Sequence, residues 1–138
     1  FTNPKVPGLD FSFSGLKTAI LYFIQKESQK NPDFIQDNIN DICASIQHTI
    51  IEILIDKLKL AVAETGINQI AIGGGVSANS GIRNTLKEGE QKYGWKTFIP
   101  KFEYTTDNAA MIGIVGYQKF LTQNFETSDV VSKARIQF

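Results

Sequence analysis

The sequence predicts an α/β fold that is rich in helix and carries an incomplete, mainly parallel sheet. Apolar residues recur at steps of three and four from Ile35 to Val62, which predicts one long amphipathic helix. Two short strand-like runs, at 69–72 and 96–99, have a helical segment between them, as in parallel strands joined by a crossover. Three consecutive glycines, residues 73–75, follow the first run, as in turns on which phosphates and nucleotides bind.

The N-terminal part is expected to form an arm and a helix before the long helix. Residues 1–10 hold two prolines and a glycine and predict an extended arm. Residues 11–15 alternate aromatic and polar side chains, which predicts a short strand, and helical spacing then continues to about Lys30. The segment 31–33, Asn-Pro-Asp, is typical of a helix start, and Gly66 is expected to end the long helix.

The C-terminal half is expected to contain two further helices. One spans residues 77–93, with its first serine as the cap and Gly94 as the stop. The other begins after the second strand, where Thr106 is expected to cap it and Asp107 to lie in its first turn. The tail over residues 123–138 is expected to be irregular or extended.

Composition and charge limit the classes of function. The 138 residues are 42% hydrophobic and 20% charged, as in a soluble globular protein, and the net charge of zero provides no overall basic field for nucleic acid. The one cysteine excludes an internal disulfide framework, and no apolar run approaches membrane-spanning length. Because two strands cannot form an independent sheet and the chain begins without Met, we expect residues 1–138 to be a single partial domain of a longer protein. Missing strands or self-association would cover its free sheet edge.

Three short motifs together resemble one protein family. They are Phe-Ser-Phe-Ser-Gly-Leu-Lys-Thr at 11–18, Gly-Gly-Gly-Val-Ser-Ala-Asn at 73–79 and Thr-Thr-Asp-Asn-Ala-Ala-Met at 105–111. Each motif is weak alone, whereas their order and spacing together are specific. They resemble the C-terminal part of the TsaD family, the tRNA N6-adenosine threonylcarbamoyltransferases, formerly called glycoproteases or O-sialoglycoprotein endopeptidases. The resemblance extends from residue 7 to about residue 119.

The resemblance implies the two-lobed fold shared by actin, sugar kinases and the Hsp70 ATPase, with this chain in the C-terminal lobe. It implies transfer of a threonylcarbamoyl group from threonylcarbamoyl-AMP to N6 of adenosine 37 in tRNAs that read ANN codons. It also implies partner proteins of the TsaB and TsaE types, no membrane and a cytoplasmic location. The fragment alone is expected to be inactive, since further nucleotide-binding segments of the family lie upstream.

The resemblance also assigns site residues. Asp107 matches the aspartate ligand of one divalent metal per full-length subunit, with iron favoured over zinc or magnesium; its alternative role is that of a helix-dipole partner. Asn79 matches the residue that contacts the adenylate, and its alternative role is to satisfy nearby backbone. Gly73, Gly74 and Gly75 are expected to pass their backbone close to an adenylate or ATP-type nucleotide, or only to shape the turn. The two histidine ligands of the family, in a His-x-x-x-His pattern, are absent from this chain.

Other polar residues have simpler explanations. Ser14 is expected to cap a helix, and Lys17 to be solvated. The basic pair of the tail, Lys133 and Arg135, is also expected to be solvated, with phosphate contacts as the alternative.

The older family name suggests a peptidase, but the residues do not support one. Cys43 and His48 are five positions apart and therefore point in different directions on a helix. Cys43 borders the apolar stripe and is expected in the core, whereas His48 lies off the stripe and is expected to be exposed. The sequence contains no His-Glu-x-x-His motif.

Two other classes of protein stay open on the sequence. One is another enzyme of the actin-like ATPase superfamily, such as a sugar kinase or a carbamoyltransferase, which would share the glycine turn. The other is a non-catalytic interaction module like TsaB, which has a related fold and lacks the metal ligands. The presence of Asp107 and Asn79 favours the transferase over this module.

Overall fold

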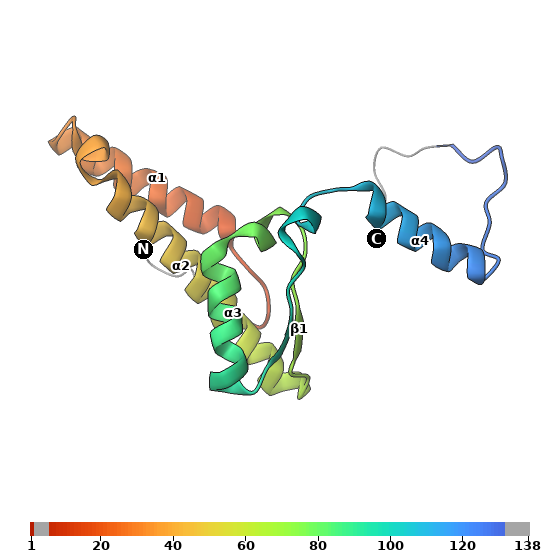
Figure 1. Cartoon of the computed structure of the whole chain (residues 1–138). Helices are drawn as coiled ribbons and strands as arrows, with labels where there is room; N and C mark the ends of the chain where they lie inside the picture. Colours follow the sequence, from red (N-terminus) through yellow and green to blue (C-terminus); the bar gives the residue numbers. More distant parts are fainter. Residues whose placement is uncertain (2–5, 132–138) are drawn as a thin grey trace.

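The computed structural model describes residue 1 and residues 6–131. Two long antiparallel helices form a hairpin that projects from a small α/β body, and a last helix stands apart from both (Figure 1). In chain order the elements are α1 (Phe13–Lys30), α2 (Phe34–Thr65), β1 (Gln69–Ala71), the 3-10 turn η1 (Gly75–Ala78), α3 (Ser80–Tyr93), β2 (Lys96–Phe98), the 3-10 turn η2 (Phe102–Tyr104) and α4 (Ala109–Leu121).

The two strands pair in parallel, as predicted. Their register places Gln69 opposite Lys96 and Ala71 opposite Phe98. Because the strands are parallel, the segments that follow them leave the sheet at the same edge. The glycine turn after β1 and the turn η2 after β2 therefore lie at one end of the body, as Figure 1 shows.

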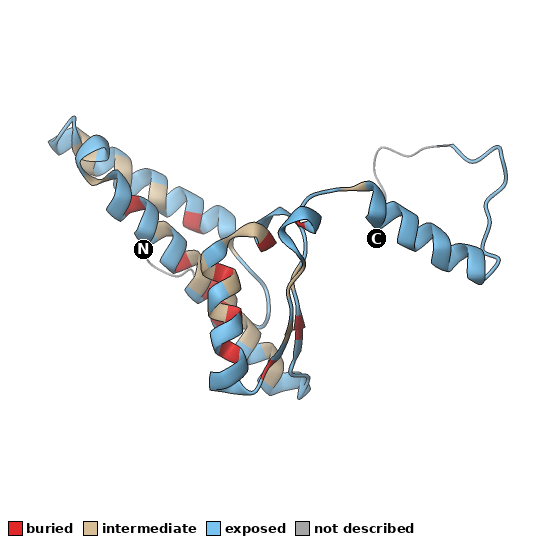
Figure 2. Ribbon diagram, in the orientation of Figure 1, coloured by how far each residue is buried: buried red, intermediate tan, exposed pale blue. Residues whose placement is uncertain are grey.

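The core of the body lies where α2, α3 and the sheet meet. Figure 2 shows buried residues along these elements, whereas α4 is exposed along its whole length. Leu86 on α3 is 1% exposed, and Trp95, just before β2, is 5% exposed. The buried cluster consists of Ile55, Ile70, Ile82, Leu86 and Trp95. The described residues contain no helix with both the length and the apolar character needed to cross a bilayer.

The long helix α2 is confirmed, with one departure from regular geometry. Gly66 ends it in the left-handed conformation, with φ of 70°, and its N–H donates to the Val62 carbonyl. Near its start Asn38 leaves helical geometry, with φ of −123°, and its side-chain amide donates to the Phe34 carbonyl at 2.9 Å. The kink separates the first turn of the helix from the rest of it.

The predicted strand at 11–15 is wrong, because α1 already begins at Phe13. The alternation of four residues is too short to compete with the helical spacing that follows it, and Leu16 is buried in the resulting helix. Ser12, not Ser14, occupies the N-cap position, and its side chain makes no capping bond. The described part of the predicted arm is non-helical, and Lys57 of α2 donates to the carbonyls of Val6 and Gly8.

The last helix begins later than predicted. Asn108 caps α4 through its side-chain oxygen, which accepts from the Met111 N–H at 3.2 Å. Thr106 is therefore not the cap, and Asp107 lies before the helix rather than in its first turn. Asparagine caps helices at least as well as threonine, and its position directly before two alanines decides the start. Beyond α4 residues 122–131 are irregular, as expected, whereas Lys133 and Arg135 lie outside the described residues.

Candidate functional site

The glycine turn after β1 leaves its backbone open to solvent. Gly74 has φ of 75° and ψ of 178°, a conformation that is essentially restricted to glycine. At Gly73 and Gly75 the φ angle is not positive, and an added Cβ would meet nothing within 4 Å at any of the three positions. Crowding within the described chain therefore does not explain Gly73 or Gly75. Close approach of a ligand to the backbone would explain both.

Ser77 stabilises the C-terminal side of this turn through hydrogen bonds, but it does not begin α3. Its hydroxyl donates to the Gly74 carbonyl at 2.7 Å, and its N–H donates to the same oxygen at 3.0 Å. These bonds form η1, and Ser77 is only 2% exposed. The prediction that Ser77 caps a helix is wrong, because the chain makes a 3-10 turn first.

Asn79 is the residue that caps α3. Its side-chain oxygen accepts from the Ile82 N–H at 3.1 Å, and its amide nitrogen donates to the Gln47 Oε1 of α2 at 3.2 Å. An asparagine amide has two donors and two acceptor lone pairs. These two bonds therefore leave Asn79 one donor and one acceptor for a ligand. The capping role is established by this geometry, and contact with an adenylate stays a prediction.

An open pocket of about 700 Å³ lies beside the glycine turn. Its size is within the range of small-molecule sites. Its lining comes from α1, α2, η1 and the start of α3: Phe13, Ile50, Leu54, Gly75, Val76, Asn79 and Ile82. Two of the three sequence motifs, at 11–18 and 73–79, thus meet at one pocket. Its walls are mostly apolar, and the Asn79 amide provides a polar group.

Arg83 joins the two turns at this end of the sheet. One of its guanidinium nitrogens donates to the Ser77 carbonyl at 2.9 Å, and the other donates to the Pro100 carbonyl at 2.7 Å. This single side chain links η1 to the segment that follows β2. Neither Arg83 nor Gln47 could be predicted from the sequence, because a bond to a distant carbonyl or side chain leaves no local pattern.

Asp107 lies on the segment between η2 and α4 and is exposed. The described residues contain no group of three or more His, Cys, Asp or Glu side chains that could hold a metal ion. A tightly bound catalytic metal usually has about three protein ligands. Asp107 could supply at most one of these ligands, and its role as a metal ligand stays a prediction.

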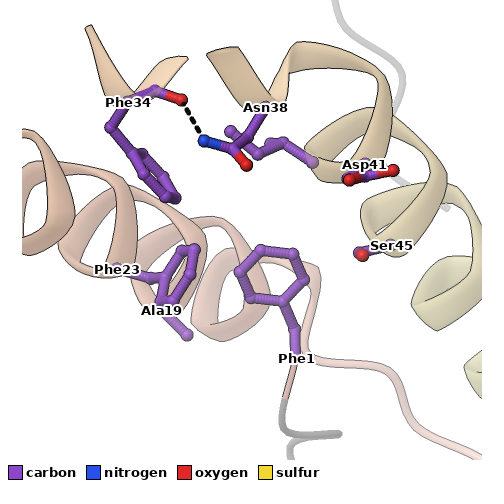
Figure 3. Close-up of a pocket in the computed structure, with 8 residues that line it drawn as sticks. Phe1, Ala19, Phe23, Phe34, Asn38, Asp41 and Ser45 are labelled. Atoms are coloured by element: carbon purple, nitrogen blue, oxygen red, sulfur yellow. Dashed lines mark hydrogen bonds between the residues drawn. The ribbon is translucent and has the colours of Figure 1, made fainter.

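A second pocket, of about 420 Å³, lies between α1 and α2 (Figure 3). Phe23 packs edge-on against Phe1 and Phe34, with ring centroids 5.3 and 5.9 Å apart. Asn38 and Asp41 add polar groups to the wall of this pocket. None of the site residues predicted from the sequence lines this pocket.

The titratable groups with displaced pKa values lie away from the glycine turn. Hydrogen bonds from Thr97 lower the pKa of Glu90, which is near the end of α3. The Lys92 ammonium, followed by that of Lys59, lowers the pKa of Tyr93 at the same end. The Glu90 bonds join α3 to β2, and neither Glu90 nor Tyr93 lines the pocket beside the glycine turn.

The residues that suggested a peptidase are both on the surface. The His48 side chain is 73% exposed, as predicted from the sequence. Its Nε2 lies 3.3 Å from the Glu52 carboxylate. Cys43 is exposed, so its predicted place in the core is wrong. It borders the apolar stripe of α2 on a side that the described chain does not cover.

A strand, a glycine turn and a capped helix beside an open pocket are typical of α/β proteins that bind phosphate-bearing ligands at the carboxyl ends of parallel strands. The family model for TsaD, tRNA N6-adenosine threonylcarbamoyltransferase, matches residues 1–114. The chain belongs to this family and corresponds to its C-terminal portion.

Curated relatives carry the same family description. A tRNA N6-adenosine threonylcarbamoyltransferase of Christiangramia forsetii is 65% identical over all of this chain, which covers 41% of that relative. Those of Riemerella anatipestifer and Porphyromonas gingivalis are 55% and 51% identical over 99% of the chain, which covers 40% of each. The chain thus spans about two fifths of the length of these relatives.

Proposed function

We propose that the full-length protein containing this chain transfers a threonylcarbamoyl group from threonylcarbamoyl-AMP to N6 of adenosine 37 in tRNAs that read ANN codons. The 65% identity to a tRNA N6-adenosine threonylcarbamoyltransferase, over the whole chain, is the observation that carries this proposal. In the reaction the adenosine amine attacks the threonylcarbamoyl carbonyl carbon. An N–C bond forms, the C–O bond to the phosphate breaks, AMP leaves and one amine proton is released.

The proposed setting is a two-lobed, actin-like protein in which residues 1–138 are a partial domain of the C-terminal lobe. The parallel strands and the glycine turn at their carboxyl ends support this assignment, because such folds bind nucleotides at that edge. The proposal includes a cytoplasmic location and partner proteins of the TsaB and TsaE types. The isolated chain is proposed to be inactive, since it lacks the His-x-x-x-His pattern expected of the family.

The adenylate is proposed to bind along the glycine turn. The open backbone at Gly73 and Gly75 supports this placement, because neither glycine is required by crowding or by a positive φ. Asn79 would contribute the amide donor and acceptor that its capping bonds leave free. In this role the chain binds and orients the substrate, and correct positioning supplies a large part of the rate enhancement in group transfer.

Asp107 is proposed to hold one divalent metal, iron in preference to zinc or magnesium, together with ligands from the upstream part. Its exposure on a segment outside both η2 and α4 leaves the carboxylate accessible to such ligands. When bound, a metal of this kind supplies Lewis-acid chemistry that orients a phosphate and stabilises developing charge. The chain itself contributes the carboxylate and its position before α4.

The test uses the full-length protein with its TsaB- and TsaE-type partners, synthetic threonylcarbamoyl-AMP and unmodified tRNA. Mass spectrometry of the nucleosides would detect threonylcarbamoyladenosine. Asp107→Asn is expected to abolish the product, whereas Glu103→Gln, which neutralises a nearby exposed carboxylate, is expected to keep it. Product from Asp107→Asn at the wild-type rate would contradict the role of Asp107. No product from the wild type, beside an active relative, would favour the kinase or the interaction module.

A second pair of variants separates the two roles of Asn79. Asn79→Asp preserves a capping oxygen but removes the amide donor, whereas Asn79→Ala removes both. Contact with the adenylate predicts that Asn79→Asp melts like the wild type and yet binds the adenylate more weakly. Unchanged affinity in Asn79→Asp would leave Asn79 with its capping role alone.

A further inference from the structure

Arg83 of α3 bonds to both of the segments that leave the sheet at the carboxyl ends of its strands. Its guanidinium donates to the Ser77 carbonyl after β1 and to the Pro100 carbonyl after β2, at 2.9 and 2.7 Å. Arg83 is half-buried, so both bonds are partly shielded from water. Ligands of α/β proteins bind in the crevice outside this edge of a parallel sheet. Arg83 therefore ties together the two segments that border such a crevice.

On the β1 side, the bond from Arg83 reaches the glycine turn through Ser77. The hydroxyl and the N–H of Ser77 both donate to the Gly74 carbonyl. Ser77 is buried and has little room to move independently. A shift of the Ser77 carbonyl would therefore displace Gly74, whose φ of 75° sets the course of the turn. Arg83 thus restrains the backbone along which the adenylate is proposed to bind.

On the β2 side, the bond restrains the segment 101–108, which carries Asp107. The turn η2 begins two residues after Pro100. Thr105 closes this turn, because its hydroxyl and its N–H donate to the Phe102 carbonyl at 2.8 and 3.2 Å. Thr105 is 3% exposed, and Asp107 follows it by two residues. A hydrogen-bonded and anchored turn therefore connects the Pro100 carbonyl to the start of Asp107.

The chemistry of arginine suits it to this link. The guanidinium is planar and presents five N–H donors in a rigid fork, so one side chain can bond two carbonyls at a set separation. Its positive charge makes both bonds stronger than bonds between neutral groups. Lysine has one ammonium group on a flexible stem and cannot set that separation in the same way.

We infer that Arg83 is a positioning residue that holds the glycine turn and the segment 101–108 at one separation, so that substrate bound on the turn is aligned with Asp107. The inference rests on the proposed transferase function, from which it takes the roles of the turn and of Asp107. Arg83 acts through these two segments and not through contact with the substrate. Its loss should therefore slow the transfer step far more than it weakens binding of the adenylate.

Single-turnover kinetics of the full-length protein test this role, with its partner proteins, synthetic threonylcarbamoyl-AMP and unmodified tRNA. Arg83→Met keeps the apolar stem and removes every donor. We expect its transfer rate at saturation to fall at least about tenfold, with half-saturation by threonylcarbamoyl-AMP within about threefold of the wild-type value. Arg83→Lys, which keeps one charged donor group, should recover part of the rate.

The matched control is Asn68→Ala. The Asn68 amide donates to the Gly94 carbonyl at 2.9 Å, so this variant loses a bond to a carbonyl at the opposite end of the sheet. Its transfer rate should equal that of the wild type, with every rate measured well below the melting temperatures. An unchanged rate in Arg83→Met would overturn the inference. An equal loss of rate in Asn68→Ala would also overturn it, because Arg83 would then act only through general stability.

Hydrogen exchange with AMP as the probe gives a readout that needs no activity. In the wild type AMP should slow exchange at least about threefold in residues 73–79 and also in 101–108, whereas in Arg83→Met only 73–79 should respond. Slowing of both segments in Arg83→Met, or of neither in an active wild type, would overturn the inference. Coupled slowing that depends on Arg83, in a wild type that makes no threonylcarbamoyladenosine, would refute the proposed transferase and leave the link through Arg83 supported.

Discussion

The α/β body and helix α4 are both rich in apolar side chains, but only the body buries them. In α3 the apolar residues lie on one side, which meets α2 and the sheet, so that Leu86 is 1% exposed. In α4 they lie all round the helix, and Ile112 is 78% exposed. An amphipathic helix can be buried by one layer of neighbours, whereas a helix that is apolar on all sides needs neighbours on several sides. The body therefore has the neighbouring elements that a core needs, whereas the described chain provides no such neighbours for α4.

Truncation of a core residue should separate the two regions most strongly. In the 138-residue chain Leu86→Ala is expected to lower the free energy of unfolding by about 2–5 kcal/mol, because it leaves a cavity in the core. The matched change in the other region, Ile112→Ala, should alter it by less than about 0.5 kcal/mol. Urea unfolding measures both. A large effect of Ile112→Ala would mean that α4 is already covered in this chain.

The glycines of the two regions should respond to alanine with opposite signs. A Cβ at Gly89 of α3 would lie 2.5 Å from the Trp95 Cε3, so Gly89→Ala is expected to destabilise the chain by about 1–3 kcal/mol. A Cβ added at Gly113 of α4 would meet nothing within 4 Å. Gly113→Ala should therefore stabilise the helical state of α4 by about 0.5–1 kcal/mol. Urea unfolding follows the first change and circular dichroism the second. Destabilisation by both would contradict the difference in packing.

Loss of the two asparagine caps should have a smaller effect, which again differs between the regions. Asn79 and Asn108 make the same capping bond, at 3.1 and 3.2 Å. Asn79→Ala is expected to cost about 1 kcal/mol of global stability, since α3 belongs to the core. Asn108→Ala should only increase fraying of α4, visible in the exchange of its first amides. Serine at each position, which keeps a capping oxygen, is the control.

The smallest expected effect on stability is that of Glu90→Gln, which should depend on pH and be confined to the body. The Thr97 N–H and hydroxyl donate to the Glu90 carboxylate at 3.1 and 2.5 Å and lower its pKa below the ordinary value of 4.5. Stabilisation from a lowered pKa is present above about pH 4.5 and is lost as the pH falls through the folded value. Glu90→Gln should therefore lower the urea midpoint slightly at pH 7, and the difference should shrink toward pH 3.

The matched control lies beyond α4. The Thr127 side chain lowers the pKa of Asp129 in the same direction, but this bond lies within the irregular segment after the helix. Asp129→Asn should leave the urea midpoint unchanged at both pH values. An equal pH dependence of the urea midpoint in Glu90→Gln and Asp129→Asn would show that the bond between Glu90 and Thr97 does not itself stabilise the body.

Local signals were sufficient to predict much of the fold. Gly66 and Gly94 end their helices with φ of 70° and 69°, a conformation in which glycine has no steric cost. The parallel pairing followed from the order of strand, helix and strand. The errors arose where two local patterns competed, as between Thr106 and Asn108 for the start of α4, or between alternation and helical spacing near Phe13.

The candidate site was only partly predictable. The glycine turn and Asn79 were found from the motif, and the structure adds the capping bond. The contacts of Asn79 with Gln47, and of Arg83 with the Pro100 carbonyl, join segments far apart in the chain, and such pairs leave no periodic pattern. The exposure of Cys43 was missed because the apolar stripe of a helix does not say which neighbours are present to cover it.

The late position of α4, in the C-terminal portion of the family, has a consequence for synthesis on the ribosome. Domains generally fold from the N-terminus as they emerge, so the upstream part would be complete before α4 leaves the ribosome. Since α4 is apolar all round and exposed in the described chain, the surface of the protein that covers it would stay open during that interval. Nascent chains of this protein would then be substrates for chaperones until α4 is released, and a premature stop codon before residue 109 would leave that surface exposed for good.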